Sequence, residues 1–226
     1  MAVVDTRPAK GPGSGVPEPA GPSPSGALPV YGLDIETDTT TDGLDPDLSA
    51  VVAIALVGPD GSHVFDGPES ESLTALDETL RALPAGIVAT WNGAAFDLPF
   101  LARRAARAGT RLGLELVADP SIAMRSDPIA GETGAYRARW FDHLHLDGYR
   151  LYRADVGRLL GLSCGLKPMA RLVGLNPVQV DRATLHELSA DEVRAYVTSD
   201  ARVTRELVMR RMPVAAAFAD RLASGG

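Results

Sequence analysis

The sequence has a single cysteine, Cys164, among 226 residues, so an intramolecular disulfide is excluded. Long apolar runs are also missing: the longest extends from Ala50 to Val57 and is too short to span a bilayer. The first residues show no basic start followed by an apolar stretch, so we expect no signal peptide. These absences predict a cytoplasmic protein with no membrane partner.

Basic residues are fewer than acidic ones, since 22 lysines and arginines stand against 29 aspartates and glutamates and give a net charge of −7. Proteins that hold nucleic acid by its backbone are usually basic, so this charge counts against a tight, non-specific DNA-binding protein. It does not exclude an enzyme that contacts phosphate through metal ions. Acidic ligands leave such a site negative until divalent cations bind.

The rest of the composition is typical of a globular protein, with 45% hydrophobic and 23% charged residues. Residues 1–27 are rich in Pro, Gly, Ser and Ala and predict a disordered tail. The apolar spacing predicts strands over residues 28–35, 51–57, 62–65, 87–91 and 139–146. It predicts helices over residues 69–83, 98–108, 153–160 and 166–173, with a long loop over 119–138.

A last helix is predicted from a capping box formed by Ser189 and Glu192, and Pro213 should break or kink it after about Met212. Three strands followed by alternating helix and strand predict an α/β fold with a mixed central sheet flanked by helices. We therefore divide the chain into a tail (1–27), one folded domain (28–212) and a C-terminal helical extension (213–226).

Two acidic residues lie at the end of the first predicted strand. Asp34 and Glu36 are two positions apart, so their side chains point to the same face of the strand. Neighbouring carboxylates repel each other, and a half-buried pair is normally neutralised by a cation. The alternative is that both lie on a solvated strand edge.

Two more acidic residues follow on other predicted elements. Asp97 lies at a strand-to-helix junction, after Asn92 and a glycine, where it can also be a helix N-cap. Asp200 lies four residues after Tyr196 in the last helix, so the two side chains share a helical face. The ordered combination of all three segments favours a carboxylate metal site more than any one of them does.

These segments resemble the motifs of the DEDD superfamily of 3′–5′ exonucleases, in its tyrosine-bearing (DEDDy) branch. Asp34–Thr37 resembles the first motif, Tyr196-x-x-x-Asp200 resembles the third, and Asn92–Leu101 resembles the second. The second is especially similar to that of the proofreading domain of family B DNA polymerases. The resemblance extends from about Leu28 to Met212 and implies an RNase H-like fold.

The resemblance also implies an activity: metal-dependent hydrolysis of phosphodiester bonds at the 3′ ends of single-stranded or frayed DNA. It implies two Mg²⁺ or Mn²⁺ ions, whose ligands would be Asp34, Glu36, Asp97 and Asp200. Tyr196 would orient the attacking water, because an unperturbed phenol is a poor base at neutral pH. These five residues are the candidate catalytic set.

Four further residues are candidate substrate contacts: Thr37, Asn92, Phe96 and Lys167. Phe96 is about equally well explained by core packing, and Thr37 by its place at a strand end. An arginine every four residues after the second motif can follow phosphates along a helix face, or can simply be solvated. That stripe is Arg103, Arg107 and Arg111.

Two other functions remain open at this point. An exoribonuclease would use the same carboxylates, and only the second motif favours DNA. A non-catalytic nucleic-acid-binding or scaffold domain would be marked by a missing carboxylate, and none is missing. The acidic balance and the tail are also compatible with a protein partner that supplies substrate affinity, whose identity the sequence does not indicate.

Overall fold

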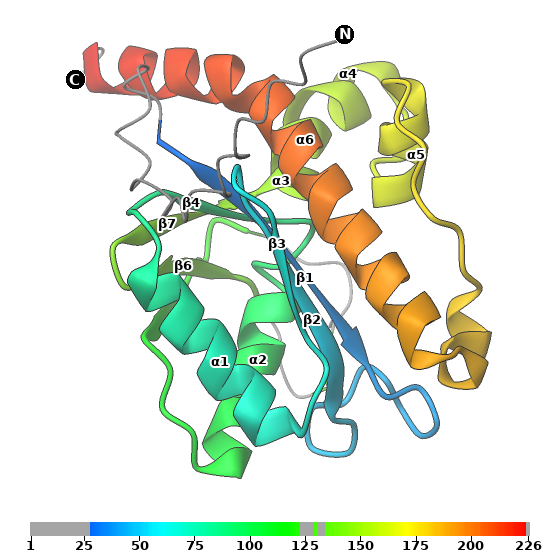
Figure 1. The fold of residues 1–226 in the computed structure, drawn as a ribbon. Helices are drawn as coiled ribbons and strands as arrows, with labels where there is room; N and C mark the ends of the chain where they lie inside the picture. Colours follow the sequence, from blue (N-terminus) through cyan, green and yellow to red (C-terminus); the bar gives the residue numbers. More distant parts are fainter. Residues whose placement is uncertain (1–27, 123–128, 131–133, 225–226) are drawn as a thin grey trace, which may run out of the picture.

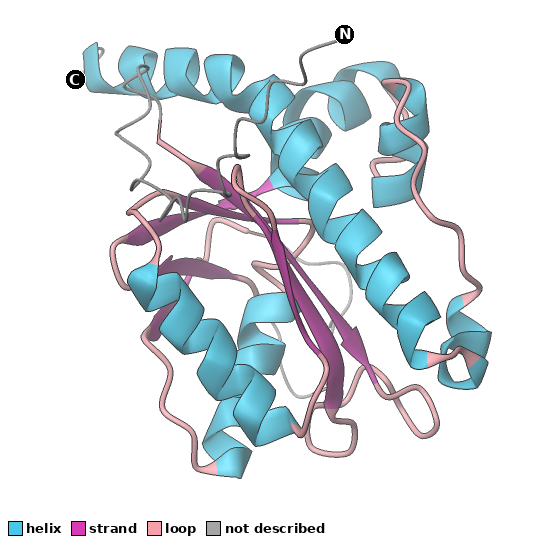
Figure 2. Ribbon diagram, in the orientation of Figure 1, coloured by secondary structure: helices cyan, strands magenta, loops and turns pink. Residues whose placement is uncertain are grey.

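The computed structural model describes residues 28–122, 129–130 and 134–224, and the predicted tail over residues 1–27 lies outside these ranges. The described residues contain one seven-stranded sheet in the order β3-β2-β1-β4-β7-β6-β5. Helices α1 and α2 lie against one face of this sheet, and the long helix α6 lies across the other (Figures 1 and 2). The architecture is therefore an α/β sandwich with a mixed sheet in the middle.

The strands are β1 Val30–Thr37, β2 Val51–Val57, β3 Ser62–Phe65, β4 Ile87–Thr90, β5 Leu114–Ala118, β6 Tyr136–Trp140 and β7 His143–Asp147. The β1–β4 and β4–β7 pairs are parallel, and the other neighbours pair antiparallel. The helices are α1 Glu69–Ala82, α2 Asp97–Ala108, α3 Gly148–Tyr152, α4 Arg158–Leu160, α5 Leu166–Leu172 and α6 Ala190–Ser224. A π-helix, η1, spans Arg153–Gly157, and a 3₁₀ helix, η2, spans Arg182–Glu187.

The central strand β1 divides its side chains between two cores. Leu33 and Ile35 belong to the main hydrophobic cluster, which also contains Leu76 of α1 and Phe100 of α2. Gly32 precedes them in sequence and faces α6, and alternation places Asp34 on that same side.

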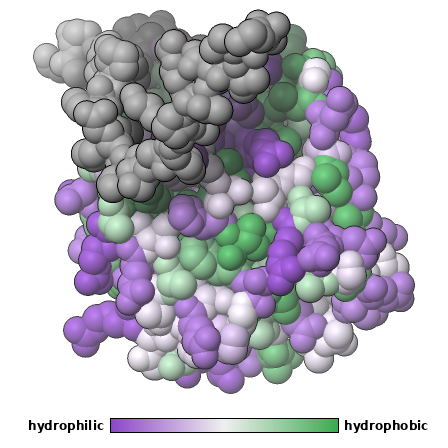
Figure 3. Space-filling view, viewed as in Figure 1, coloured by the Kyte–Doolittle hydropathy of each residue, from purple (hydrophilic) through white to green (hydrophobic). Residues whose placement is uncertain are grey.

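Hydrophilic and hydrophobic side chains are intermixed over the face seen in Figure 3, with apolar ones gathered near its centre.

The region after α2 departs from the predicted pattern. Residues 114–118 form strand β5, for which the sequence pattern gave no strand, and residues 136–138, expected in a loop, begin β6. The single strand predicted over residues 139–146 is wrong, because β6 and β7 form an antiparallel hairpin there. Phe141 takes a φ of 52° in its two-residue turn. A bulky residue in that conformation gives no turn signal, since glycine and asparagine are the usual residues there.

The last helix begins with the predicted capping box: the Ser189 N–H donates to the Glu192 carboxylate at 2.9 Å, and the Glu192 N–H to Ser189 Oγ at 3.4 Å. The helix does not end near Met212 but continues through Pro213 to Ser224. Figure 1 shows its red C-terminal part running at an angle to the orange part that crosses the sheet. A helix tolerates proline by bending in this way. No helix of the described residues is long and apolar enough to cross a membrane.

Candidate metal centre and active site

Three carboxylates from two elements meet between β1 and α6. Each of Asp34, Glu36 and Asp200 offers an oxygen within 4.8 Å of the others. Glu36 and Asp200 are buried, with 6% and 3% of their surface exposed. Negative charges that are this close together and this buried raise the free energy of the folded state unless a cation neutralises them. The three side chains can therefore hold a metal ion.

The close approach of α6 to β1 depends on Gly32, which has no side chain. A Cβ placed on Gly32 would lie 2.1 Å from the backbone oxygen of Ala201 and 2.8 Å from the Arg205 Cβ. Glycine thus allows the helix to lie directly on the strand. Ala201 follows Asp200 in sequence, so this contact also brings the Asp200 carboxylate to the β1 pair.

Tyr196 lies one helical turn before Asp200, and both side chains line a cavity of about 900 Å³. The tyrosine is buried, with 2% of its surface exposed. The Lys167 ammonium lies 4.4 Å from the centre of its ring and forms an ion pair with Asp200. One cation from α5 thus contacts both residues of the third motif, and a role for Lys167 in substrate binding stays a prediction.

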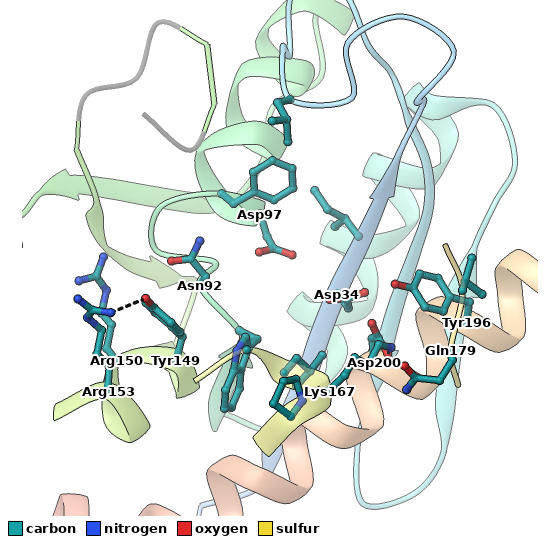
Figure 4. A pocket seen from close by; sticks show the side chains of 18 of the residues that line it. Asp34, Asn92, Asp97, Tyr149, Arg150, Arg153, Lys167, Gln179, Tyr196 and Asp200 are labelled. Atoms are coloured by element: carbon teal, nitrogen blue, oxygen red, sulfur yellow. Dashed lines mark hydrogen bonds and ion pairs between the residues drawn. The ribbon is translucent and has the colours of Figure 1, made fainter. Parts of the chain in front are cut away.

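Asp97 comes to the same cavity from the other side of the sheet. It is the first residue of α2, and Phe96 rather than Asp97 is the N-cap, so the alternative explanation of Asp97 as a helix cap is wrong. Asp97 lines the cavity but is not a member of the group formed by Asp34, Glu36 and Asp200. In Figure 4 its carboxylate points toward Asp34 across the cavity. Its assignment to a second metal ion stays a prediction.

The turn that carries Asn92 is held by a residue that sequence reasoning missed. The Asp147 carboxylate, at the end of β7, accepts the backbone N–H groups of Asn92 at 3.0 Å and Ala94 at 3.2 Å. Asn92 itself has a φ of 67°, a conformation that asparagine tolerates better than most residues. Burial raises the pKa of Asp147 above its ordinary value, while these backbone donors and Arg150 oppose that rise. Nothing in the local sequence distinguishes Asp147 from an ordinary strand-end aspartate.

Most of these residues line the cavity of about 900 Å³, but Glu36 and Asp147 are not part of its lining. Its lining includes seven of the nine predicted site residues, namely Asp34, Asn92, Phe96, Asp97, Lys167, Tyr196 and Asp200. Sequence reasoning missed Trp91, Tyr149 and Gln179, which line it as well. Trp91 directly follows β4, Tyr149 lies in α3, and Gln179 lies in the segment after α5. A lone aromatic or amide residue carries no spacing signal that would have marked these positions.

Other predicted site residues have different surroundings. Phe96 both lines the cavity and packs against Phe100, with ring centres 5.5 Å apart, so both of its expected roles are compatible with the structure. Thr37 does not line the cavity, and its hydroxyl donates to the Gly43 carbonyl at 2.7 Å. Arg103 forms a bidentate ion pair with Asp47, and Arg107 contacts the same carboxylate at 3.4 Å. Neither of these two arginines lines the cavity.

His145 should make the stability of the protein depend on pH, whatever the function of the protein is. Burial, aided by Arg150, lowers the pKa of His145 from 6.5 to about 4, and its Nε2 lies 2.8 Å from the Thr90 hydroxyl. The unfolded chain binds the proton more tightly than the folded one, so stability is full above about pH 6.5 and falls as the pH drops toward 4. The loss should reach about 3 kcal/mol at most.

Urea unfolding at pH 7.5, 6 and 5 measures this loss, with a His145→Gln variant as the comparison. The variant has no imidazole to protonate, so its stability should change less over this interval than that of the unmodified protein. Equal losses in the two proteins would show that His145 is not responsible.

The chain is similar to parts of two known DNA polymerases. No known protein-family profile matches the chain. The chain is 30% identical over 145 residues to a catalytic subunit of DNA polymerase epsilon from Arabidopsis thaliana, a match that covers 62% of the chain and 6% of that protein. A solved family B DNA polymerase from the hyperthermophilic archaeon Pyrobaculum calidifontis matches with a TM-score of 0.63 at 19% identity, over 82% of this chain and 25% of that one.

The fold is α/β and RNase H-like, as predicted. Both comparisons relate the chain to a part of a DNA polymerase, and the chain spans only a small fraction of the polymerase that it matches in sequence. At 19% identity the structural match shows the fold alone.

Proposed function

We propose that this protein is a metal-dependent 3′–5′ exonuclease of the DEDDy type that acts on single-stranded or frayed DNA ends. The observation that carries the proposal is the meeting of Asp34, Glu36 and Asp200 within 4.8 Å, with Tyr196 on the same helix as Asp200. The resemblance of the three motifs supports the same activity. The names of both similar proteins, which are DNA polymerases, favour DNA over RNA.

The donor set fits hard divalent cations. Three carboxylates supply only oxygen ligands, which Mg²⁺ and Mn²⁺ prefer. In this proposal Asp34, Glu36 and Asp200 would hold one ion, and Asp97 would help to hold a second. Two such ions, when bound, activate a water molecule and stabilise the charge that develops on a phosphodiester during hydrolysis.

The chain's own side chains would position the reactants. Asn92 offers an amide to a sugar or phosphate, and Phe96 offers an aromatic face on which a base can stack. Lys167 is a flexible point charge beside Asp200 and can move to a substrate phosphate once a metal ion neutralises that carboxylate. The buried phenol of Tyr196 can hold the attacking water by a hydrogen bond.

One assay tests the activity and its alternatives. End-labelled single-stranded DNA, duplex DNA and RNA are incubated with Mg²⁺, Mn²⁺ or a chelator. Stepwise shortening from the 3′ end that requires metal supports the proposal. Faster shortening of RNA would identify an exoribonuclease, and binding without shortening would identify a non-catalytic binding domain.

Tyr196→Phe should slow hydrolysis by about 10- to 100-fold, which is the usual range for the loss of one positioned group. Metal affinity should be unchanged, because the phenol is not among the clustered carboxylates. Single-turnover kinetics and calorimetric titration with Mn²⁺ measure the two quantities. An unchanged single-turnover rate would rule out the orienting role of Tyr196.

A further inference from the structure

The cavity has two ends of opposite charge. Figure 4 shows Asp34 and Asp200 at one end and Arg150 and Arg153 at the other, with Asn92 between them. All five residues line the same space of about 900 Å³. A space with acidic ligands at one end and guanidinium groups at the other suits an anionic ligand that extends beyond the metal site.

The arginine end is built from contacts within one short stretch of chain. Arg150 Nε lies 3.5 Å from an oxygen of Asp147, whose side chain is 4% exposed and which also holds the Asn92 turn. Arg153 donates to the Tyr149 hydroxyl at 3.1 Å, and its guanidinium lies 5.8 Å from the centre of that ring. The two guanidinium groups are therefore oriented before any ligand arrives.

A π-helix begins at this end of the cavity. α3 ends at Tyr152 and η1 begins at Arg153, so the helix widens where the second arginine turns toward the cavity. Isolated π-helical turns are rare, and they are frequent at functional sites. Tyr149 and Arg153 are four residues apart, a helical spacing that brings their side chains into contact, and both line the cavity.

On the basis of the proposed function, we propose that Arg150 and Arg153 bind a second phosphate of the DNA strand, on the 5′ side of the bond that is cleaved. A terminal nucleotide with a free 3′ hydroxyl carries one phosphate, and that phosphate is the scissile one. It belongs at the carboxylate end, where the metal ions would be. Every other phosphate of the strand lies toward the 5′ side, so only an upstream phosphate can reach the arginines.

Guanidinium groups at fixed positions suit phosphate binding better than a diffuse positive surface charge would. Guanidinium offers paired N–H donors in the geometry that phosphate oxygens accept. The protein's net charge of −7 gives little general attraction to a polyanion, so a few placed cations must supply it. The preferred substrate is then a strand with at least two phosphates in the cavity.

A substrate-length series tests the proposal. Oligonucleotides of two to about six residues, each with and without a 5′ phosphate, are cleaved under kcat/KM conditions. In the unmodified protein kcat/KM should rise about tenfold at the step where a second phosphate first reaches the arginines, as expected for one charge-assisted contact. In Arg153→Gln that step should disappear.

Arg158→Gln is the matched control, because Arg158 is an exposed arginine of the same helical stretch that does not line the cavity. It should keep the full step. Arg150→Gln should also lose the step, and thermal unfolding of this variant shows whether its ion pair with Asp147 matters for folding. A step that survives in Arg153→Gln overturns the proposal.

Binding without cleavage supplies a second measurement. Fluorescence anisotropy with an Asp34→Asn protein gives the slope of log affinity against log salt concentration for single-stranded DNA. Adding Arg153→Gln should reduce that slope by about 0.7, the value for one phosphate contact on a single strand. An unchanged slope contradicts the proposal. If the unmodified protein shortens no oligonucleotide at all, the proposed exonuclease function fails instead.

Discussion

Asp200→Asn is expected to reduce metal-dependent cleavage by about 1,000-fold or more, with the fold intact. The substitution keeps the shape of the side chain but removes the charge that α6 contributes to the cluster with Asp34 and Glu36. Loss of one metal-binding carboxylate removes several kcal/mol of charge stabilisation at the reacting phosphate, and each 1.4 kcal/mol is worth about tenfold in rate. Single-turnover kinetics with labelled single-stranded DNA measures the loss.

The metal-binding role has a readout that needs no substrate. Mn²⁺ should raise the melting temperature of the unmodified protein, since a ligand that binds only the folded state stabilises it. This increase should be absent or much smaller in Asp200→Asn. Asp191→Asn is the matched control, because Asp191 lies on the same helix with an exposed side chain and pairs locally with Arg194. A folded Asp200→Asn protein that keeps its full activity would refute the assignment.

Gly32→Ala is expected to have the largest effect on stability, a loss of about 3 kcal/mol. The added methyl group would lie 2.1 Å from the Ala201 carbonyl, which is backbone and cannot turn aside as a flexible side chain can. Either α6 moves away from β1 or the variant does not fold. Urea unfolding gives the loss, and any variant that folds should also bind Mn²⁺ more weakly, because α6 carries Asp200.

Gly67→Ala provides the comparison for this substitution. A Cβ at Gly67 would have its nearest contact at 3.9 Å, to the Ser72 hydroxyl, which is an ordinary van der Waals distance. Its stability should therefore stay within about 0.5 kcal/mol of the unmodified protein or rise slightly. If the two alanine variants are equally stable, the close packing of α6 on β1 is not what restricts position 32.

Regular patterns in the sequence determined much of the fold. The strands over residues 51–57 and 62–65 have the predicted bounds, and the α1 and α2 helices differ from prediction by one residue at an end. Apolar spacing and turn residues carry this information locally. The β6–β7 hairpin was missed because its turn has Phe141 rather than glycine at positive φ, and the Phe141 side chain packs against the main hydrophobic cluster.

Short segments of the sequence also indicate which chemical groups the site contains. Alternation along β1 places Asp34 and Glu36 on one face, and helical spacing places Tyr196 and Asp200 on another, whatever the rest of the chain does. The sequence by itself could thus identify the carboxylates as candidate metal ligands. It could not give their separation, because that depends on how closely α6 lies against β1.

Only the tertiary structure decided which side chains share the cavity. The contact of Gly32 with Ala201 brings Asp200 to the β1 carboxylates, and the Asp147 carboxylate fixes the Asn92 turn from 55 residues away. Long-range contacts of this kind leave no periodic trace in the chain, since each partner has its own local role. The sequence determined which groups can bind metal, and the packing of one helix on one strand decided that they meet.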